Sequence, residues 1–121
     1  MQERSFRGLL VWRQAMSLAR NCYFLTKKLP KEELYGLIRQ MRRAAVSVPA
    51  NIAEGSGRST KRDFVNFLRI SQGSLRELET YLELIVEVGL VSRKNTEDLQ
   101  MEVESVAKLL NRLIQSLQPP T

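Results

Sequence analysis

The chain has 121 residues, of which 43% are hydrophobic and 7% aromatic. This length favours a single domain, and this apolar content excludes a disordered tail. Nineteen lysines and arginines against thirteen acidic residues give a net charge of +6, which permits contact with nucleic acid or an anionic surface without proving either.

The charge is unevenly distributed along the chain. Residues 1–76 contain 15 basic and 5 acidic residues, a balance of +10, whereas residues 77–121 contain 4 and 8, a balance of −4. Cys22 is the single cysteine, which excludes an intrachain disulfide and suits a reducing compartment. Because the N-terminus does not resemble a signal peptide and no apolar run approaches ~20 residues, we expect a cytoplasmic protein without membrane contact.

The hydrophobic spacing predicts four helices and no strand. The first helix is expected over about residues 9–28 and has two adjacent apolar stripes: Trp12, Met16, Ala19, Tyr23 and Thr26, and Val11, Ala15, Leu18, Cys22 and Leu25. Two stripes are wider than a single partner helix covers. Two interpretations remain open: a helix sunk deep in its own bundle, or a helix buried on two sides, one of them against a second subunit.

The second helix is expected over about residues 31–54. Its apolar stripe passes through Pro49 without changing phase. Since a proline inside a helix removes one hydrogen bond and clashes with the preceding turn, the unbroken stripe predicts a kink at Pro49 rather than a helix end. Asn51 is expected to satisfy backbone groups near this kink, and Gly55 to end the helix as a left-handed cap.

The segment after the second helix is rich in glycine, serine and arginine. A phosphate-binding Walker loop needs Gly-Lys-Ser/Thr after a strand, but here Arg58 follows Gly57 and a helix precedes the segment. We therefore interpret the segment as a connection between two helices, with an ion pair between Glu54 and Arg58. The residues assigned to this structural joint are Pro49, Asn51, Glu54, Gly55 and Gly57.

The third helix is expected over about residues 60–88, with Thr60 and Asp63 resembling a capping box and Gly89 stopping the helix. The fourth is expected over about residues 96–117, with Asn95 as its cap. Its apolar residues follow a heptad seam through Leu99, Val103, Val106, Leu110, Leu113 and Leu117. Four helices with short connections predict an all-α fold, an up-down antiparallel four-helix bundle forming one domain over residues 1–121.

No set of residues in this sequence assembles an active site. The chain has no histidine, which excludes histidine-based triads and argues against the Glu-x-x-His ligands of di-iron bundles. Cys22 lies in an apolar stripe without an evident base, as expected of a core residue. We therefore expect no enzymatic activity, no catalytic residue, no metal site and no cofactor.

The arginines are the best organised polar residues. Arg58, Arg62 and Arg69 are expected to lie along one edge of the third helix, and Arg39, Arg42 and Arg43 cluster on the second. These six residues are the candidate nucleic-acid-binding positions. Such rows are often solvated faces that pair with acidic residues of the same chain; the alternative is an extended surface that follows phosphates.

Three segments resemble one protein family: "LLVWRQAMSLA", "YGLIRQMRRAAVSVPANIAEGSGR" and "FVNFLRISQGSLRELET". Over about residues 9–90, the chain resembles the 23S rRNA intervening-sequence protein family of bacterial four-helix-bundle proteins. The Pro-Ala-Asn-Ile-Ala-Glu-Gly run is specific to that family. The resemblance implies that six residues occupy signature positions of the family: Arg39, Arg42, Arg43, Asn51, Glu54 and Arg58.

The resemblance implies an up-down bundle that assembles into a homopentamer, without enzymatic activity. Some members are encoded inside insertions in the 23S rRNA gene, and distant relatives are accessory proteins of diversity-generating retroelements that bind a reverse transcriptase and nucleic acid. Two hypotheses follow. The first is a homo-oligomer that binds structured RNA or DNA through its arginines. The second is a protein-interaction scaffold or accessory subunit for a reverse transcriptase or another protein, without direct nucleic-acid binding.

Overall fold

The structure is a computed structural model that describes residues 5–118; the remaining residues of the expected domain 1–121 lie outside the described part. It contains four α-helices: α1 (Leu10–Thr26), α2 (Arg39–Ser56), α3 (Lys61–Glu87) and α4 (Glu97–Leu117). Shorter helical turns are η1 (Phe6–Gly8), η2 (Lys31–Glu33), η3 (Leu34–Ile38) and η4 (Arg93–Thr96). Residues 5–118 contain no strand, so the predicted all-α, four-helix class is confirmed.

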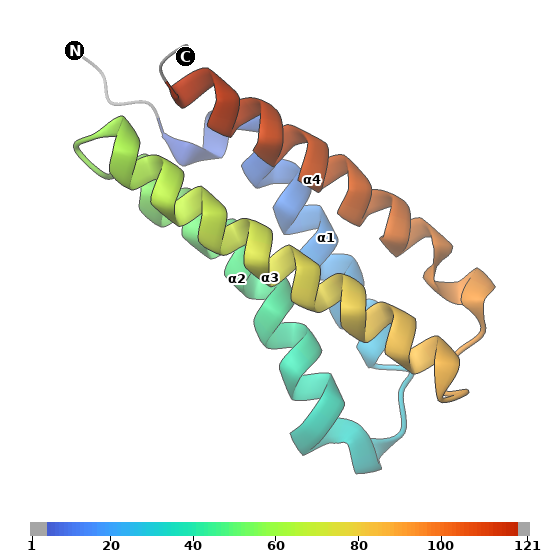
Figure 1. Ribbon diagram of the computed structural model, residues 1–121. Coiled ribbons are helices and arrows are strands. Elements are labelled where there is room, and N and C mark those ends of the chain that lie inside the picture. Colours follow the sequence, from blue (N-terminus) through green and yellow to red (C-terminus); the bar gives the residue numbers. More distant parts are fainter. Residues whose placement is uncertain (1–4, 119–121) are drawn as a thin grey trace.

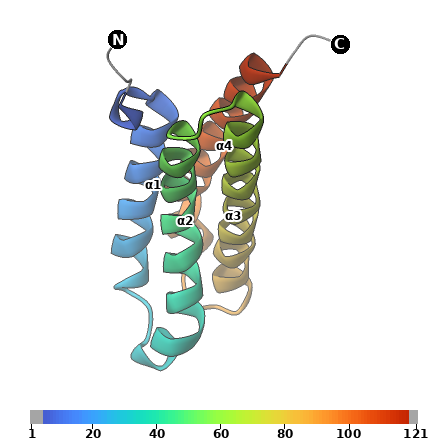
Figure 2. The same cartoon turned by 90° about the vertical axis from the view of Figure 1, so that its left-hand side faces the viewer.

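The four helices lie side by side, and the chain reverses direction at each connection (Figures 1 and 2). In Figure 2 the chain descends along α1, returns along α2, descends along α3 and returns along α4. The contact between α2 and α3 is the most extensive, whereas α4 makes fewer contacts with α1 and α3. Grooves therefore open along both sides of α4. Within residues 5–118, every helix is too short or too polar to span a bilayer.

The core is built from the stripes that the spacing predicts. Its fully buried side chains include Leu18, Met41, Ile52, Leu68, Leu78, Leu82, Ile85 and Leu110. On α1 only one of the two stripes is fully covered, with Ala15, Leu18 and Cys22 at 0% exposure. On the other stripe Trp12 and Met16 are half-buried and Tyr23 is 38% exposed. The bundle thus leaves part of the second stripe open.

The α-helix α2 begins later than the sequence suggests. Pro30 precedes the 3₁₀ turn η2, and a single π turn, η3, separates that turn from the α-helical hydrogen bonds that start at Arg39. Gly36, a residue with a low preference for α-helix, lies inside η3. The apolar stripe continues through this segment, so hydrophobic spacing alone does not reveal the change of helix type.

The expected left-handed cap at Gly55 is wrong. α2 continues through Gly55 to Ser56, and its C-cap Gly57 has φ −88°, in the right-handed region. Gly55 is buried, and a β-carbon there would lie 2.7 Å from the β-carbon of Phe67. Close packing therefore explains the glycine. Gly89, with φ +80°, does have the left-handed conformation, directly after the C-cap Val88 of α3.

Pro49 is buried inside α2, which is helical on both sides of it. The Asn51 amide donates to the carbonyl and to the hydroxyl of Ser47, both at 2.9 Å. The carbonyl that loses its helical donor to a proline belongs to the residue four positions earlier, here Ala45. The Asn51 amide thus does not donate a hydrogen bond to the Ala45 carbonyl, the group that Pro49 leaves without its helical donor. The kink itself stays a prediction.

The caps of the last two helices differ in how well they were predicted. The hydroxyl of Thr60 accepts a hydrogen bond from the Asp63 amide at 3.1 Å, as a helix N-cap does. Asn95 does not cap α4, because it lies inside the turn η4 and Thr96 is the N-cap. The buried Thr96 hydroxyl donates to the carbonyl of Arg93 at 2.8 Å, which holds the turn together.

Candidate nucleic-acid interface

The expected row of Arg58, Arg62 and Arg69 is divided in the structure. Arg58 precedes α3; its Nη2 lies 3.4 Å from Oε1 of Glu54, which confirms the expected ion pair, and its guanidinium lies 4.6 Å from the ring centre of Phe67. Phe67 is on the α2 side of α3, since it packs against Gly55. Arg62 and Arg69 instead line a groove towards α4. The prediction of one continuous edge is therefore wrong.

A groove between the start of α3 and the end of α4 brings together three basic residues, Lys61, Arg62 and Arg69. It has a volume of about 680 Å³. The residues that line this α3–α4 groove are Lys61, Arg62, Val65, Asn66, Arg69, Ser116, Leu117 and Gln118. No carboxylate is among them, although Asp63 belongs to the same first turn of α3. Within residues 5–118, the three ion pairs involve none of Lys61, Arg62 and Arg69.

Lys61 and Asn66 are the polar residues of α3 in this groove that were not predicted from the sequence. Asn66 lies four positions after Arg62 on α3, so helical spacing from Arg62 was the signal that could have found it. Lys61 is adjacent to Arg62, and helical spacing does not place adjacent residues on one face. The partner residues Ser116 to Gln118 come from the end of α4, far away in the sequence. Only the packing of the two helices shows that they share a groove.

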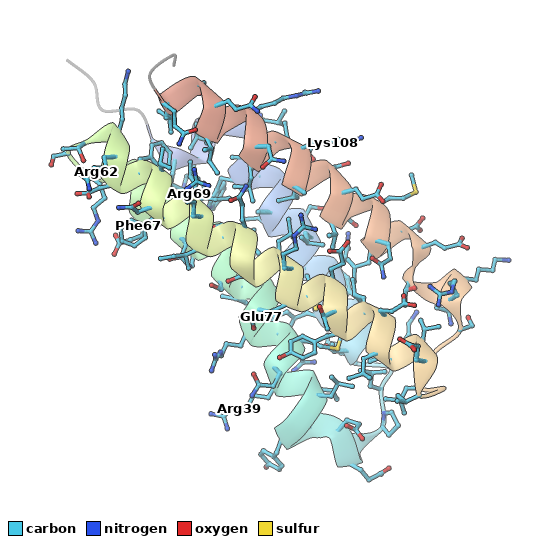
Figure 3. The ribbon with its side chains drawn as sticks, in the orientation of Figure 1. Arg39, Arg62, Phe67, Arg69, Glu77 and Lys108 are labelled. Atoms are coloured by element: carbon cyan, nitrogen blue, oxygen red, sulfur yellow. The ribbon has the colours of Figure 1, made fainter. Side chains whose placement is uncertain are left out.

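The second arginine cluster is brought together at the start of α2. The groove there has a volume of about 680 Å³, and we call it the arginine–tyrosine groove. It is lined by Tyr23, Leu34, Tyr35, Ile38, Arg39, Arg42, Arg43, Val46 and Ser47. Arg39 projects outward from the beginning of α2 (Figure 3).

Arg42 is held in place from two sides. Its Nε donates to Oγ1 of the buried Thr26 at 2.9 Å, and its guanidinium lies 4.6 Å from the ring centre of Tyr23. Thr26 and Tyr23 are both on α1, so Arg42 joins the two helices and its charged end faces the groove.

The comparisons with known proteins agree with this architecture. The family model described as 23S rRNA-intervening sequence protein matches residues 7–112. The chain belongs to this family. Among solved structures, it is similar to a protein of unknown function from the S23 ribosomal protein family of Bacteroides thetaiotaomicron, with 26% identity and a TM-score of 0.81. The similarity covers 88% of this chain and 99% of that chain. No curated protein matches this sequence.

Two further ionisable groups, Glu83 and Cys22, have pKa values that their surroundings in the fold shift. Arg93 holds Glu83 through two hydrogen bonds of 2.9 and 3.0 Å, and these bonds lower the pKa of the Glu83 carboxyl. Burial raises the pKa of the Cys22 thiol to about 12, an effect that the charge of Arg42 partly offsets. Among the described residues, no three histidine, cysteine, aspartate or glutamate side chains gather as metal ligands.

Proposed function

We propose that this protein is a non-enzymatic homo-oligomer that binds structured RNA or DNA through arginine-rich grooves. The observation that carries the proposal is the α3–α4 groove, where Lys61, Arg62 and Arg69 meet without a lining carboxylate and without an ion-pair partner in residues 5–118. Cations without a carboxylate partner are available to bind the phosphates of a nucleic acid. Each phosphate that they neutralise releases condensed counterions, which favours binding.

The other lining groups of the groove suit the same ligand. The amides of Asn66 and Gln118 and the hydroxyl of Ser116 are groups that bind phosphate and sugar oxygens in nucleic-acid complexes. Contacts of this kind position a nucleic acid without reading its bases. We therefore expect binding that tolerates many sequences and depends strongly on salt.

An uncovered apolar stripe on α3 supports the oligomer. Ile70, Leu84 and Val88 are 50%, 42% and 59% exposed. Tyr81 and Val88 are spaced by seven residues, and Ile70 and Leu84 by twice that interval, as in a coiled-coil seam. The exposed Glu77 interrupts the stripe between Ile70 and Leu84. A second copy of the chain would cover this stripe. The number of subunits that we propose, five, rests on the family resemblance.

The proposal is tested by fluorescence anisotropy with labelled RNA and DNA over a range of salt concentrations. Replacing Lys61, Arg62 and Arg69 with Gln removes three cations from the groove. At ~0.7–0.9 per phosphate, the slope of log affinity against log salt should fall by roughly 2. The matched control replaces the exposed Arg13, Arg20 and Lys27 of α1 and its C-cap, which changes the net charge equally.

Two outcomes would contradict the proposal. If the wild-type protein binds neither RNA nor DNA at low salt, nucleic-acid binding fails as a function. If the control triple variant loses as much binding as the groove variant, the effect comes from net charge and the α3–α4 groove is not the site. Circular dichroism of all variants checks that the helical content is unchanged.

A second candidate function is a scaffold or accessory subunit that docks a protein partner, such as a reverse transcriptase. One observation favours it: a groove of about 730 Å³ between α1 and α4 is lined by Phe24 and Met101, which are 56% and 65% exposed. Apolar docking there would persist in high salt, whereas phosphate binding would not. A salt titration of the complex with the isolated partner distinguishes the two functions.

A further inference from the structure

The arginine–tyrosine groove contains an unusually exposed aromatic ring. Tyr35 is 84% exposed, the most of any large hydrophobic side chain in the described residues. It lies in the π turn η3, and π turns are frequent at functional sites. The burial of Tyr35 therefore contributes little to folding, and most of its side chain is accessible to a ligand.

The rest of the groove combines apolar surface with positive charge. Leu34 and Val46 are 42% and 43% exposed and provide apolar walls. Arg39, Arg42 and Arg43 provide three guanidinium groups, and no carboxylate lines the groove. Glu32 and Glu33, the acidic residues closest in sequence, belong to the preceding turn η2 and are not among the lining residues.

Two of these arginines are free to meet a ligand. Within residues 5–118, neither Arg39 nor Arg43 takes part in an ion pair, and both are exposed. Arg42 is different, because its hydrogen bond to Thr26 and its stacking on Tyr23 fix its position before any ligand arrives. The groove thus offers one anchored cation and two cations without an ion-pair partner in residues 5–118, beside an exposed ring.

We propose that the arginine–tyrosine groove binds unpaired nucleotides of a single-stranded RNA or DNA segment. An unpaired base presents a flat face that stacks on an aromatic ring, while its phosphates accept hydrogen bonds from arginines. A duplex hides its base faces and would leave Tyr35, Leu34 and Val46 without contacts. In this arrangement Tyr35 stacks a base, Leu34 and Val46 contact the apolar parts of the nucleotide, and Arg39 and Arg43 bind the phosphates.

This inference rests on the proposed function in that both require nucleic-acid binding. It concerns a separate groove, formed by α1, η3 and α2, which shares no lining residue with the α3–α4 groove. The α3–α4 groove contacts phosphates, and the arginine–tyrosine groove selects strands with unpaired bases. Separate variants can therefore test the two grooves independently.

The experiment measures fluorescence anisotropy of the full chain with four probes: a short uridine oligonucleotide, a thymidine oligonucleotide of the same length, an RNA duplex, and a peptide of Glu and Phe residues. Tyr35→Ser should weaken binding of the uridine or thymidine strand roughly tenfold, from the loss of about one stacked base, and leave duplex binding unchanged. Tyr35→Phe keeps the ring face and should bind like the wild type.

The matched control is Phe24→Ala, which removes another exposed aromatic ring, 56% exposed and also near a cation, Lys27 at 5.7 Å. Phe24 does not line the arginine–tyrosine groove, so this variant should bind single strands normally. The double variant Arg39→Gln/Arg43→Gln should lower the single-strand salt slope by roughly 1.4, at ~0.7 per phosphate.

The outcomes separate the two proposals. If the wild type binds no nucleic acid, both fail. If the Lys61–Arg62–Arg69 variant loses single-strand binding while Tyr35→Ser retains it, the inference is overturned and the proposed function stands. Equal losses of strand and duplex binding in Tyr35→Ser also overturn it, as does a loss confined to the acidic peptide, which would make the groove a protein site. Loss of single-strand binding alone supports it.

Discussion

Gly55 of α2 packs so closely against Phe67 of α3 that a β-carbon on Gly55 would lie 2.7 Å from the Phe67 β-carbon. The same atom would lie 2.9 Å from the ring of Phe64. The β-carbon of Phe67 is attached directly to the α3 backbone and cannot rotate away. The two helices can therefore approach here only because residue 55 has no side chain.

Gly55→Ala should lower the free energy of unfolding by about 1–3 kcal/mol, because the added methyl group forces the α2–α3 contact apart. The matched control is Gly57→Ala. A β-carbon on Gly57 would have only the Glu54 carbonyl nearby, at 3.7 Å, and its φ of −88° suits alanine. This change should be neutral or stabilise by up to ~1 kcal/mol. Urea denaturation of both variants checks the difference, and equal effects would contradict the close-packing explanation.

Gly55 also shows what the sequence can and cannot predict. A glycine after an apolar stripe serves either as a left-handed cap or as a close contact, and both leave the same letter in the sequence. The helix end at Gly89 was predicted correctly, since α3 ends at Glu87 and Val88 is its C-cap. At Gly55 the deciding atoms belong to Phe64 and Phe67, on the next helix.

The four helices could be predicted because their apolar periodicity is long and regular. Leu78, Leu82 and Ile85 of α3, for example, are fully buried as their spacing predicts. The heptad seam of α4 was predicted less well at its end, where Ile114 is buried and Leu113 is half-buried. The π turn η3 could not be predicted, since its residues continue the apolar stripe of α2.

The positions of the arginines show the limit of spacing arguments. A seven-residue interval places two side chains together only within one continuous helix. Arg62 and Arg69 satisfy this condition. Arg58 precedes α3, and its position is set by its contacts with Glu54 and Phe67 instead. Likewise, the anchoring of Arg42 by Thr26 depends on how α1 packs against α2, which the sequence does not display.

The second prediction concerns Cys22, whose side chain is fully buried. Burial raises its pKa from 9.0 to about 12, so the reactive thiolate is scarce near neutral pH. A thiol reagent should label Cys22 readily in urea and only at the rate of unfolding in the native protein. Rapid labelling of the native protein would contradict this burial.

The same shift predicts a dependence of stability on pH. A pKa raised in the folded state favours the protonated thiol, so its contribution is complete below pH 9.0 and is lost as pH rises from 9.0 towards about 12. The difference in unfolding free energy between the wild type and Cys22→Ala should therefore shrink over that range. A constant difference would show that the thiol does not titrate in this way.

The third prediction concerns the pair formed by Glu83 and Arg93. The two hydrogen bonds from Arg93 lower the pKa of Glu83, so Arg93→Gln should return that pKa towards its ordinary value. The stabilisation from this pair is present above the pKa of the unfolded state and decreases as pH falls through the lowered folded value. Carboxyl NMR titration measures the shift. Arg76→Gln, which affects Glu79 instead, should leave Glu83 unchanged; an unaltered Glu83 pKa in Arg93→Gln would contradict the prediction.

The fourth prediction concerns assembly, for which α3 offers an exposed apolar stripe beside its buried one. Light scattering at micromolar concentration should give the wild type a mass several times that of the 13.9 kDa chain. A wild type that stays monomeric across this range would end the oligomer proposal.

Leu84→Lys places a charge between Tyr81 and Val88 in the α3 stripe, where a second copy would have to desolvate it. We expect the mass of this variant to fall towards that of one chain, with its helical content unchanged because Leu84 is 42% exposed in the bundle. Met101→Lys is the matched control, since Met101 is 65% exposed on α4 and lies outside the stripe. It should assemble like the wild type. If the Met101→Lys variant dissociates and the Leu84→Lys variant does not, the subunit interface lies at the α1–α4 groove that Met101 lines and not on α3.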